Sequence, residues 1–244
     1  MAKEARLKVK LISFTKEAEE TVSAAIRQCY SSIGANQLLK KADQATKKKL
    51  INLVMFSGHT STIEHASFTF AIEGISRTCS HQLVRHRIAS FSQQSQRYVD
   101  LSKKEIAYII PPEISHSKRN SLKFRKMMFE VEKSYRDLVS NGTAPEDARF
   151  ILPNACETKI VVTMNARSLV NFFRLRTCMR AQWEIRALAN QMMVLVKSEA
   201  PLLFANIGPS CQTEKICWEG KLSCGLWKKI SQAQLKTREG NDSF

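Results

Sequence analysis

The sequence predicts an α+β fold in which a mixed, largely antiparallel sheet packs with long helices in a single domain. Short stretches of alternating apolar and polar residues, typical of half-buried strands, occur among longer segments with apolar residues at helical spacing. These strands and helices lack the regular alternation of a doubly wound sheet. The chain has 244 residues, of which 43% are hydrophobic and 25% charged, so it can bury one substantial core.

The first half of the chain contains expected strands and helices in turn. Apolar and polar residues alternate over residues 7–11 and again over residues 67–72, which predicts a strand at each place. A helix is expected over residues 16–29, and a shorter one over residues 47–57. The shorter helix should end at Gly58, because glycine readily adopts the left-handed conformation that follows many helices.

The middle of the chain predicts a strand and then a long helix. The strand over residues 107–110 should end at the two prolines that follow it. The Thr-x-x-Glu pattern of residues 143–146 predicts a capping box, with Thr143 at the start of a further helix. The long helix should run up to Gly142 and bury a stripe of apolar residues at helical spacing: Phe124, Met127, Val131, Tyr135 and Leu138.

The last third predicts a brief strand over residues 160–164, a helix that Asn165 caps, and another helix before Pro201. Beyond these elements the pattern loosens into Gly, Pro, Ser and charged residues. We therefore expect residues 1–205 to form the folded domain and residues 206–244 to form an irregular, basic, cysteine-containing tail.

Arginines are concentrated in two stretches, residues 74–99 and residues 158–183, that contain no Asp or Glu. A purely structural surface normally intersperses both signs of charge. Guanidinium groups without partners in the chain suit the phosphate or carboxylate oxygens of a ligand. The stretches predict anion sites that could line one pocket from two sides or from two subunits; the alternative is a solvated basic face for each. The arginines are Arg77, Arg85, Arg87, Arg97, Arg167, Arg174, Arg176 and Arg180.

The composition limits where in the cell the protein is expected and which partners it is expected to bind. Residues 1–10 lack the apolar core of a signal peptide, and no apolar run reaches the roughly 18 residues that a membrane span needs. The protein is therefore expected in the cytoplasm, with no membrane partner and with its seven cysteines as free thiols. The net charge of +16 fits nucleic acid or small anions. Because the lysines are scattered while the arginines cluster, discrete pockets for small anions are favoured over a nucleic-acid partner.

Several common kinds of site are missing from the sequence. No two of the eight glycines are separated by a single residue, so the G-x-G-x-x-G fingerprint is absent, and there is no P-loop. Neither a G-x-S-x-G elbow nor an H-E-x-x-H motif occurs. Cys211, Cys217 and Cys224 lie six and seven residues apart, unlike the short intervals of zinc knuckles, and no fourth ligand is evident, so no metal site is expected.

Residues 58–65 read Gly-His-Thr-Ser-Thr-Ile-Glu-His and connect an expected helix to an expected strand. Taken alone, the segment reads as a loop in which His65 caps the strand and Glu64 pairs with an arginine. The alternative is a ligand loop, in which the His, Ser and Glu side chains hydrogen-bond a ligand held by the arginines.

The order of four motifs resembles that of the flavin-dependent thymidylate synthases. The family signature is an Arg-His-Arg, a spacer of seven residues and a Ser-x-Arg, and it is matched by residues 85–87 and 95–97. Residues 58–65 resemble the family's upstream flavin loop, residues 148–153 its central arginine motif, and residues 165–184 its C-terminal helices.

The resemblance implies a homotetramer of mixed α and β subunits that share each active site. The implied reaction makes thymidylate (dTMP) from deoxyuridylate (dUMP) and yields tetrahydrofolate. The folate 5,10-methylenetetrahydrofolate gives the carbon, reduced FAD gives the hydride, and NADPH re-reduces the flavin. The implied FAD contacts are His59, Ser61, Glu64, Arg85, His86, Arg87, Asn165, Arg167 and Asn171. The implied nucleotide contacts are Gln82, Arg85, Gln93, Gln94, Ser95, Gln96, Arg97, Arg149 and Arg176, of which Arg176 is the catalytic residue that polarises the uracil ring.

The chain departs from the family pattern in its signature segment. Ser92-Gln93 stands where Asn-Glu is common, and Gln96 where Gly is common. Gln93 can hydrogen-bond a ligand but places no carboxylate beside it, and Gln96 adds a side chain where close backbone approach is expected. No base that could activate Ser95 is evident, so Ser95 is expected to position the phosphate or the ring rather than to act as a nucleophile.

Two other classes of function remain open from the residues alone. One is a basic nucleic-acid-binding protein, which salt-sensitive retention on DNA would identify. The other is a thiol- or metal-based redox protein, which stoichiometric zinc would identify. Bound flavin distinguishes a thymidylate synthase from both.

Overall fold

The computed structural model describes residues 2–39 and 42–228. The chain divides into two compact units. Unit 1 comprises Met1–Lys10 and Phe70–Val162, and unit 2 comprises Leu11–Thr69 and Thr163–Phe244. Of the expected tail, residues 229–244 lie outside the described residues. None of the described helices is both long enough and apolar enough to cross a membrane.

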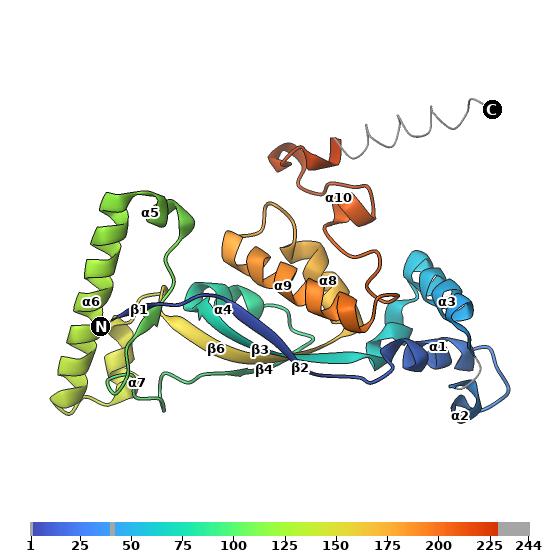
Figure 1. Cartoon of the computed structure of the whole chain (residues 1–244), viewed down its shortest axis with the longest axis horizontal. Helices are drawn as coiled ribbons and strands as arrows, with labels where there is room; N and C mark the ends of the chain where they lie inside the picture. Colours follow the sequence, from blue (N-terminus) through green and yellow to red (C-terminus); the bar gives the residue numbers. More distant parts are fainter. Residues whose placement is uncertain (1, 40–41, 229–244) are drawn as a thin grey trace. The chain divides into compact units, whose positions relative to one another are not determined.

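The main sheet has four strands, and its largely antiparallel character agrees with the expected α+β class (Figure 1). Along the chain, β2, β3 and β6 each pass from one unit into the other, whereas β4 belongs to unit 1. A separate parallel pair joins two short strands of unit 1. The sheet order is β2 (Lys8–Phe14), β3 (Ser67–Ser76), β6 (Glu157–Asn165), β4 (Ser90–Gln93), and the separate pair is β1 (Lys3–Glu4) with β5 (Ala107–Tyr108).

The central strands β3 and β6 lie where the sequence predicted strands. In β3 the predicted alternation is confirmed: Phe68 and Phe70 are fully buried, while Thr69 between them is half-buried. In β6, which was predicted only as a brief strand, Ile160, Val162 and Met164 are likewise the buried residues. The edge strand β2 is exposed or half-buried throughout, as an edge position allows.

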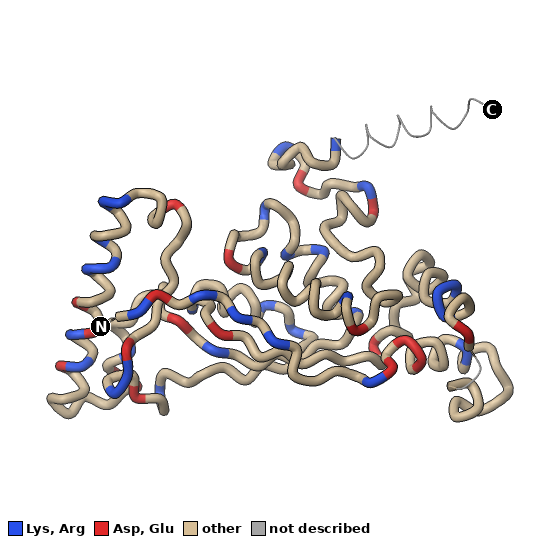
Figure 2. Tube along the Cα trace, in the orientation of Figure 1, with Lys and Arg blue, Asp and Glu red and all other residues tan. Residues whose placement is uncertain are grey.

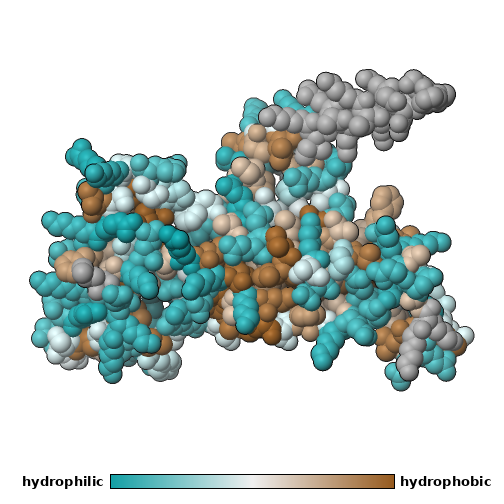
Figure 3. Space-filling view, in the orientation of Figure 1, coloured by the Kyte–Doolittle hydropathy of each residue, from teal (hydrophilic) through white to brown (hydrophobic). Residues whose placement is uncertain are grey.

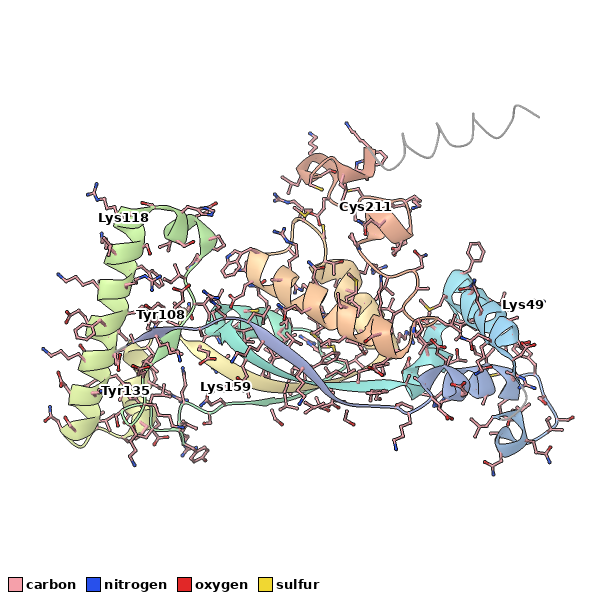
Figure 4. All side chains as sticks on the ribbon, viewed as in Figure 1. Lys49, Tyr108, Lys118, Tyr135, Lys159 and Cys211 are labelled. Carbon is pink, nitrogen blue, oxygen red and sulfur yellow. The ribbon has the colours of Figure 1, made fainter. Side chains whose placement is uncertain are left out.

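Unit 1 packs its helices over a core that includes Tyr108 and Tyr135, both labelled in Figure 4. Its longest helix, α6, is the expected one, and Figure 2 shows Lys and Arg recurring along it. Its buried stripe corrects the expectation: Met127 is 58% exposed, whereas Met128 is 2% exposed. Met128 lies seven residues before Tyr135, so both fall on one helix face. The helices are α4 (Arg77–Leu83), α5 (Pro112–His116), α6 (Lys118–Ser140), α7 (Pro145–Ala148) and the 3₁₀-helix η2 (Arg149–Ile151).

The expected capping box at Thr143 is wrong. Helix α7 begins one residue later, with Ala144 at the cap position and no side-chain hydrogen bond there. Pro145 occupies the first helical position, which its fixed φ favours, and this placement leaves Thr143 outside the helix.

In unit 2, the structure confirms the predicted end of one helix at Gly58 and the predicted start of another at Asn165. Gly58 follows α3 with φ 77°, a left-handed conformation. Asn165 caps α8, because its Oδ1 accepts a hydrogen bond of 2.8 Å from the Ser168 backbone N–H. Phe68 packs edge-on against Phe204 in the core. The helices are α1 (Ala18–Gln28), α2 (Ala35–Leu38), α3 (Gln44–Ser57), η1 (Thr60–His65), α8 (Ala166–Arg176), α9 (Trp183–Glu199), α10 (Ser210–Thr213) and η3 (Gly220–Leu222).

Candidate functional site

The Arg-His-Arg segment follows helix α4 of unit 1. Ser76 caps that helix, since its Oγ accepts a hydrogen bond of 3.0 Å from the Cys79 N–H, and Leu83 is its last residue. The side chains of Arg85 and Arg87 are exposed just beyond, and neither has an ion-pair partner within residues 2–39 and 42–228. These two guanidiniums therefore fit the expectation of arginines that await an anion.

Strand β4 is fastened to its surroundings by Gln93. The amide nitrogen of this side chain donates to Ser80 Oγ at 2.9 Å and to Thr158 Oγ1 at 3.0 Å. The Gln94 backbone N–H donates to the Lys159 carbonyl at 2.8 Å. The Gln93 nitrogen thus ties β4 to α4 and β6, and its carbonyl oxygen is the part left for a ligand.

Residues 95–98, which we call the signature turn, are organised by Ser95. Its Oγ accepts hydrogen bonds from the backbone N–H groups of Arg97 at 3.1 Å and of Tyr98 at 3.4 Å. The hydroxyl oxygen therefore shapes the turn, while the hydroxyl proton stays able to donate. The Arg97 guanidinium lies 5.2 Å from the centre of the Tyr98 ring, a cation–π distance.

Two arginines of unit 1, Arg97 and Arg149, contact Glu146, and the charge of Arg149 reaches a third, Arg77. Arg97 Nε lies 2.5 Å from Glu146 Oε2, and Arg149 Nε donates to the Glu146 backbone carbonyl at 2.9 Å. The pKa of half-buried Arg77 is lowered, chiefly by burial and then by the charge of Arg149. Glu146 offsets the charge of Arg97, while Arg77 and Arg149 add positive charge that suits a phosphate. We call Arg77, Arg97, Arg149 and Glu146 the arginine cluster.

Two members of this cluster, Arg77 and Glu146, were not among the site residues that the sequence predicted. Arg77 lies in the first acid-free stretch, but its spacing does not associate it with Arg149. Glu146 is recognisable in sequence only as part of an apparent capping box. The expectation that the arginines lack acidic partners is also wrong for three of them. Arg97, Arg167 and Arg174 pair with Glu146, Glu64 and Glu214, respectively.

In unit 2, η1 and α8 bring together two of the expected flavin contacts. Arg167 Nη1 lies 2.6 Å from Glu64 Oε1, and the Ala166 N–H donates to the Ala66 carbonyl at 2.7 Å. This ion pair agrees with the reading of residues 58–65 as a loop in which Glu64 pairs with an arginine. Its side chains are 54% and 40% exposed, so the pair contributes little stability and a ligand can replace either partner.

The remaining expected contacts of unit 2 lie on the same two elements. His59 and Ser61 are exposed at the start of η1. Asn171 is exposed one turn after Arg167 on the same side of α8, because residues four apart share a helix face. Arg176, nine residues after Arg167, is half-buried at the end of α8 and points to the opposite side.

The expected contacts divide between the two units. Unit 2 holds Arg176 and six of the flavin contacts: His59, Ser61, Glu64, Asn165, Arg167 and Asn171. Unit 1 holds the other flavin contacts and all nucleotide contacts except Arg176: Gln82, Arg85, His86, Arg87, Gln93, Gln94, Ser95, Gln96, Arg97 and Arg149. Neither unit by itself therefore contains a complete set for either ligand.

Comparison with known proteins gives a consistent result. Residues 10–202 match a family described as thymidylate synthase complementing protein. A flavin-dependent thymidylate synthase of Geobacter sulfurreducens is 50% identical over 226 residues, 93% of this chain and 97% of that protein. One of Clostridium tetani is 48% identical over 94% of this chain and 97% of its own length. A solved UMP/dUMP methylase from Streptomyces cacaoi has the same fold, with a TM-score of 0.75, 24% identity and coverage of 84% of this chain and 96% of its own.

Proposed function

We propose that this chain, which belongs to the flavin-dependent thymidylate synthase family, converts dUMP to dTMP. The proposed reaction consumes 5,10-methylenetetrahydrofolate and NADPH with one proton, and it yields dTMP, tetrahydrofolate and NADP⁺. The arginine cluster of unit 1 carries the proposal, because it offers excess positive charge to a nucleotide phosphate beside the signature turn.

On the substrate side, Arg97 and Arg149 are proposed to hold the dUMP phosphate. Ser95 keeps its hydroxyl proton and is proposed to donate it to the same ligand. Arg176 is proposed to lie against the uracil ring and to stabilise the negative charge that grows as the ring is activated. The other proposed nucleotide contacts, which add hydrogen bonds, are Gln82, Arg85, Gln93, Gln94 and Gln96.

On the cofactor side, FAD supplies the hydride chemistry when it is bound. The donor set fits an anionic cofactor. Arg85 and Arg87 are exposed without acidic partners among the described residues, and Arg167 is held only by an exposed ion pair with Glu64. Because no glycine-rich turn exists to cradle the pyrophosphate, side chains have to bind it. The other proposed FAD contacts are His59, Ser61, His86, Asn165 and Asn171.

We propose that the active enzyme is a cytoplasmic homotetramer. Residues 85–98, which contain the family signature, support an interface between copies, because Ile88 and Tyr98 are 75% and 78% exposed there. Large apolar side chains next to an anion site are covered if a second subunit completes the site. Sedimentation at equilibrium tests this directly, and a monomer that is active at all concentrations would contradict it.

The test of the proposed function is an anaerobic assay with the purified protein, FAD, dUMP, methylenetetrahydrofolate and NADPH. With protein from which bound flavin has first been removed, we expect dTMP to form, and its formation to stop when any one component is omitted. Formation without flavin, or none with every component present, would contradict the proposal.

A further inference from the structure

One cavity of unit 2 is lined by cysteines that the proposed reaction does not use. It has a volume of about 560 Å³. Cys178 reaches it from the loop after α8, Cys211 from α10, and Cys217 and Cys224 from either side of η3. Figure 4 labels Cys211 at α10. The sequence shows the last three of these cysteines as a possible set, and the fold adds the fourth from a distant segment. We call the four the cysteine cluster.

All four thiols belong to the lining of this one cavity. Cys211 is buried there, with 8% of its surface exposed. Cys178 Sγ accepts a hydrogen bond of 3.5 Å from the backbone N–H of Arg180, two residues later. Such a bond helps to hold the sulfur in place.

The segment around η3 has little apolar core of its own. Ile216, Trp218 and Leu222 are 45%, 72% and 62% exposed, and Figure 3 shows apolar side chains on this surface. A short segment that buries so few large side chains needs another source of stability, and a bound metal commonly supplies it.

We propose that Cys178, Cys211, Cys217 and Cys224 bind one Zn²⁺ ion, which fixes the C-terminal segment to the loop after α8. Four sulfur ligands favour zinc over magnesium or calcium, which prefer oxygen. Arg174 and Arg180 also line the cavity. Arg174 is already paired with Glu214, whereas the charge of Arg180 would partly offset the two net negative charges that four thiolates leave on the zinc.

Zinc binding requires the thiols to move together and to release their protons. Within the described residues, no three metal-binding side chains are already arranged as a metal site. The zinc therefore has to draw the thiols together to about 2.3 Å from the metal, and the thiol protons leave as the Zn–S bonds form.

The experiment is a metal analysis of the full chain, purified without chelator or added metal. We expect one zinc per chain in the wild type and less than about a fifth of that in Cys178→Ser, since structural zinc sites need all four ligands. Cys29→Ser is the matched control, because Cys29 is an exposed cysteine that does not line the cavity. It should keep its zinc. Replacement of the zinc by Co²⁺ in the wild type should give the intense visible bands of a tetrahedral cobalt thiolate.

Several results would overturn the proposal. They are a wild type without zinc, iron in place of zinc, or equal zinc in Cys178→Ser and Cys29→Ser. Fewer than seven titratable thiols in the denatured, metal-free wild type, with the loss mapped to these four cysteines, would show a disulfide in the cluster and would also overturn it. If Cys178→Ser fails to fold, the zinc content and the cobalt spectrum of the wild type still decide the question.

Discussion

Arg97 and Glu146 form an ion pair in which Nε and a carboxylate oxygen are 2.5 Å apart. The side chains are 55% and 44% exposed, so the pair adds no more than about 1 kcal/mol to stability. The larger effect of this ion pair is on the orientation of the Arg97 guanidinium. Because Nε engages Glu146, the terminal nitrogens of the guanidinium are left to meet phosphate oxygens in a fixed orientation.

Arg97→Lys should weaken dUMP binding by about 1.5–3 kcal/mol, because lysine keeps the charge but loses the fork that can meet two oxygens. The FAD content should not change. Calorimetric titration with dUMP measures the first, and absorbance measures the second. Arg125→Lys is the matched control, since Arg125 forms a comparable exposed pair of 2.6 Å with Glu4. Equal loss of both ligands in Arg97→Lys would assign Arg97 to folding or to the flavin.

Arg176→Ala should lower turnover by about two to three orders of magnitude, the scale of losing one charge-stabilising donor in the transition state. NADPH should still reduce the bound flavin. Stopped-flow measurement of flavin reduction and flavin oxidation, each at saturating ligand, separates the two steps. Full recovery of turnover at saturating dUMP would mean that Arg176 contributes only to binding.

Gly74→Ala should destabilise the protein by more than about 2 kcal/mol, because two costs combine. Gly74 has φ 70°, and an added Cβ would lie 1.9 Å from the Arg6 backbone oxygen. Gly142→Ala is the matched control: φ is 89° and nothing lies within 4 Å of the added Cβ, so only the strain of about 1–2 kcal/mol applies. Urea unfolding measures both variants. Equal losses would show that the backbone of residue 6 moves away easily.

Burial raises the pKa of the Cys156 thiol to about 12 from an ordinary value of 9.0. The folded protein therefore keeps this proton where the unfolded chain loses it. The resulting stabilisation is complete below pH 9 and is lost as the pH rises from 9 toward 12. The difference in unfolding free energy between wild type and Cys156→Ala should shrink over that range.

Alkylation provides a second measurement on the same thiol. At pH 8, iodoacetamide should modify exposed Cys29 much faster than buried Cys156 in the native protein, because the thiolate is the reactive form. Equal rates for the two cysteines would contradict the burial of Cys156.

The sequence predicted those features that depend on neighbouring residues. The strands β3 and β6, the end of α3 at Gly58 and the cap at Asn165 follow from local patterns, and the structure confirms them. The prediction from sequence failed where two local signals competed. The capping pattern at Thr143 lost to the preference of Pro145 for the first helical position.

The candidate site was predictable only in part, because its geometry depends on long-range contacts. The nearest acid to Arg97 in the sequence is Asp100, but the fold pairs Arg97 with Glu146 from another segment. The influence of Arg149 on Arg77 is equally invisible in the spacing. The Glu64–Arg167 pair was foreseen as a pairing with some arginine, and the structure identifies which one.

In the proposed reaction, hydride reaches the new methyl group through flavin bound to this chain. The most direct measurement is a single turnover without NADPH, in which the purified protein carries FAD that has been reduced chemically under anaerobic conditions. On addition of dUMP and methylenetetrahydrofolate, we expect one dTMP for each flavin oxidised. Flavin that stays reduced, or flavin that is oxidised without formation of dTMP, would contradict it.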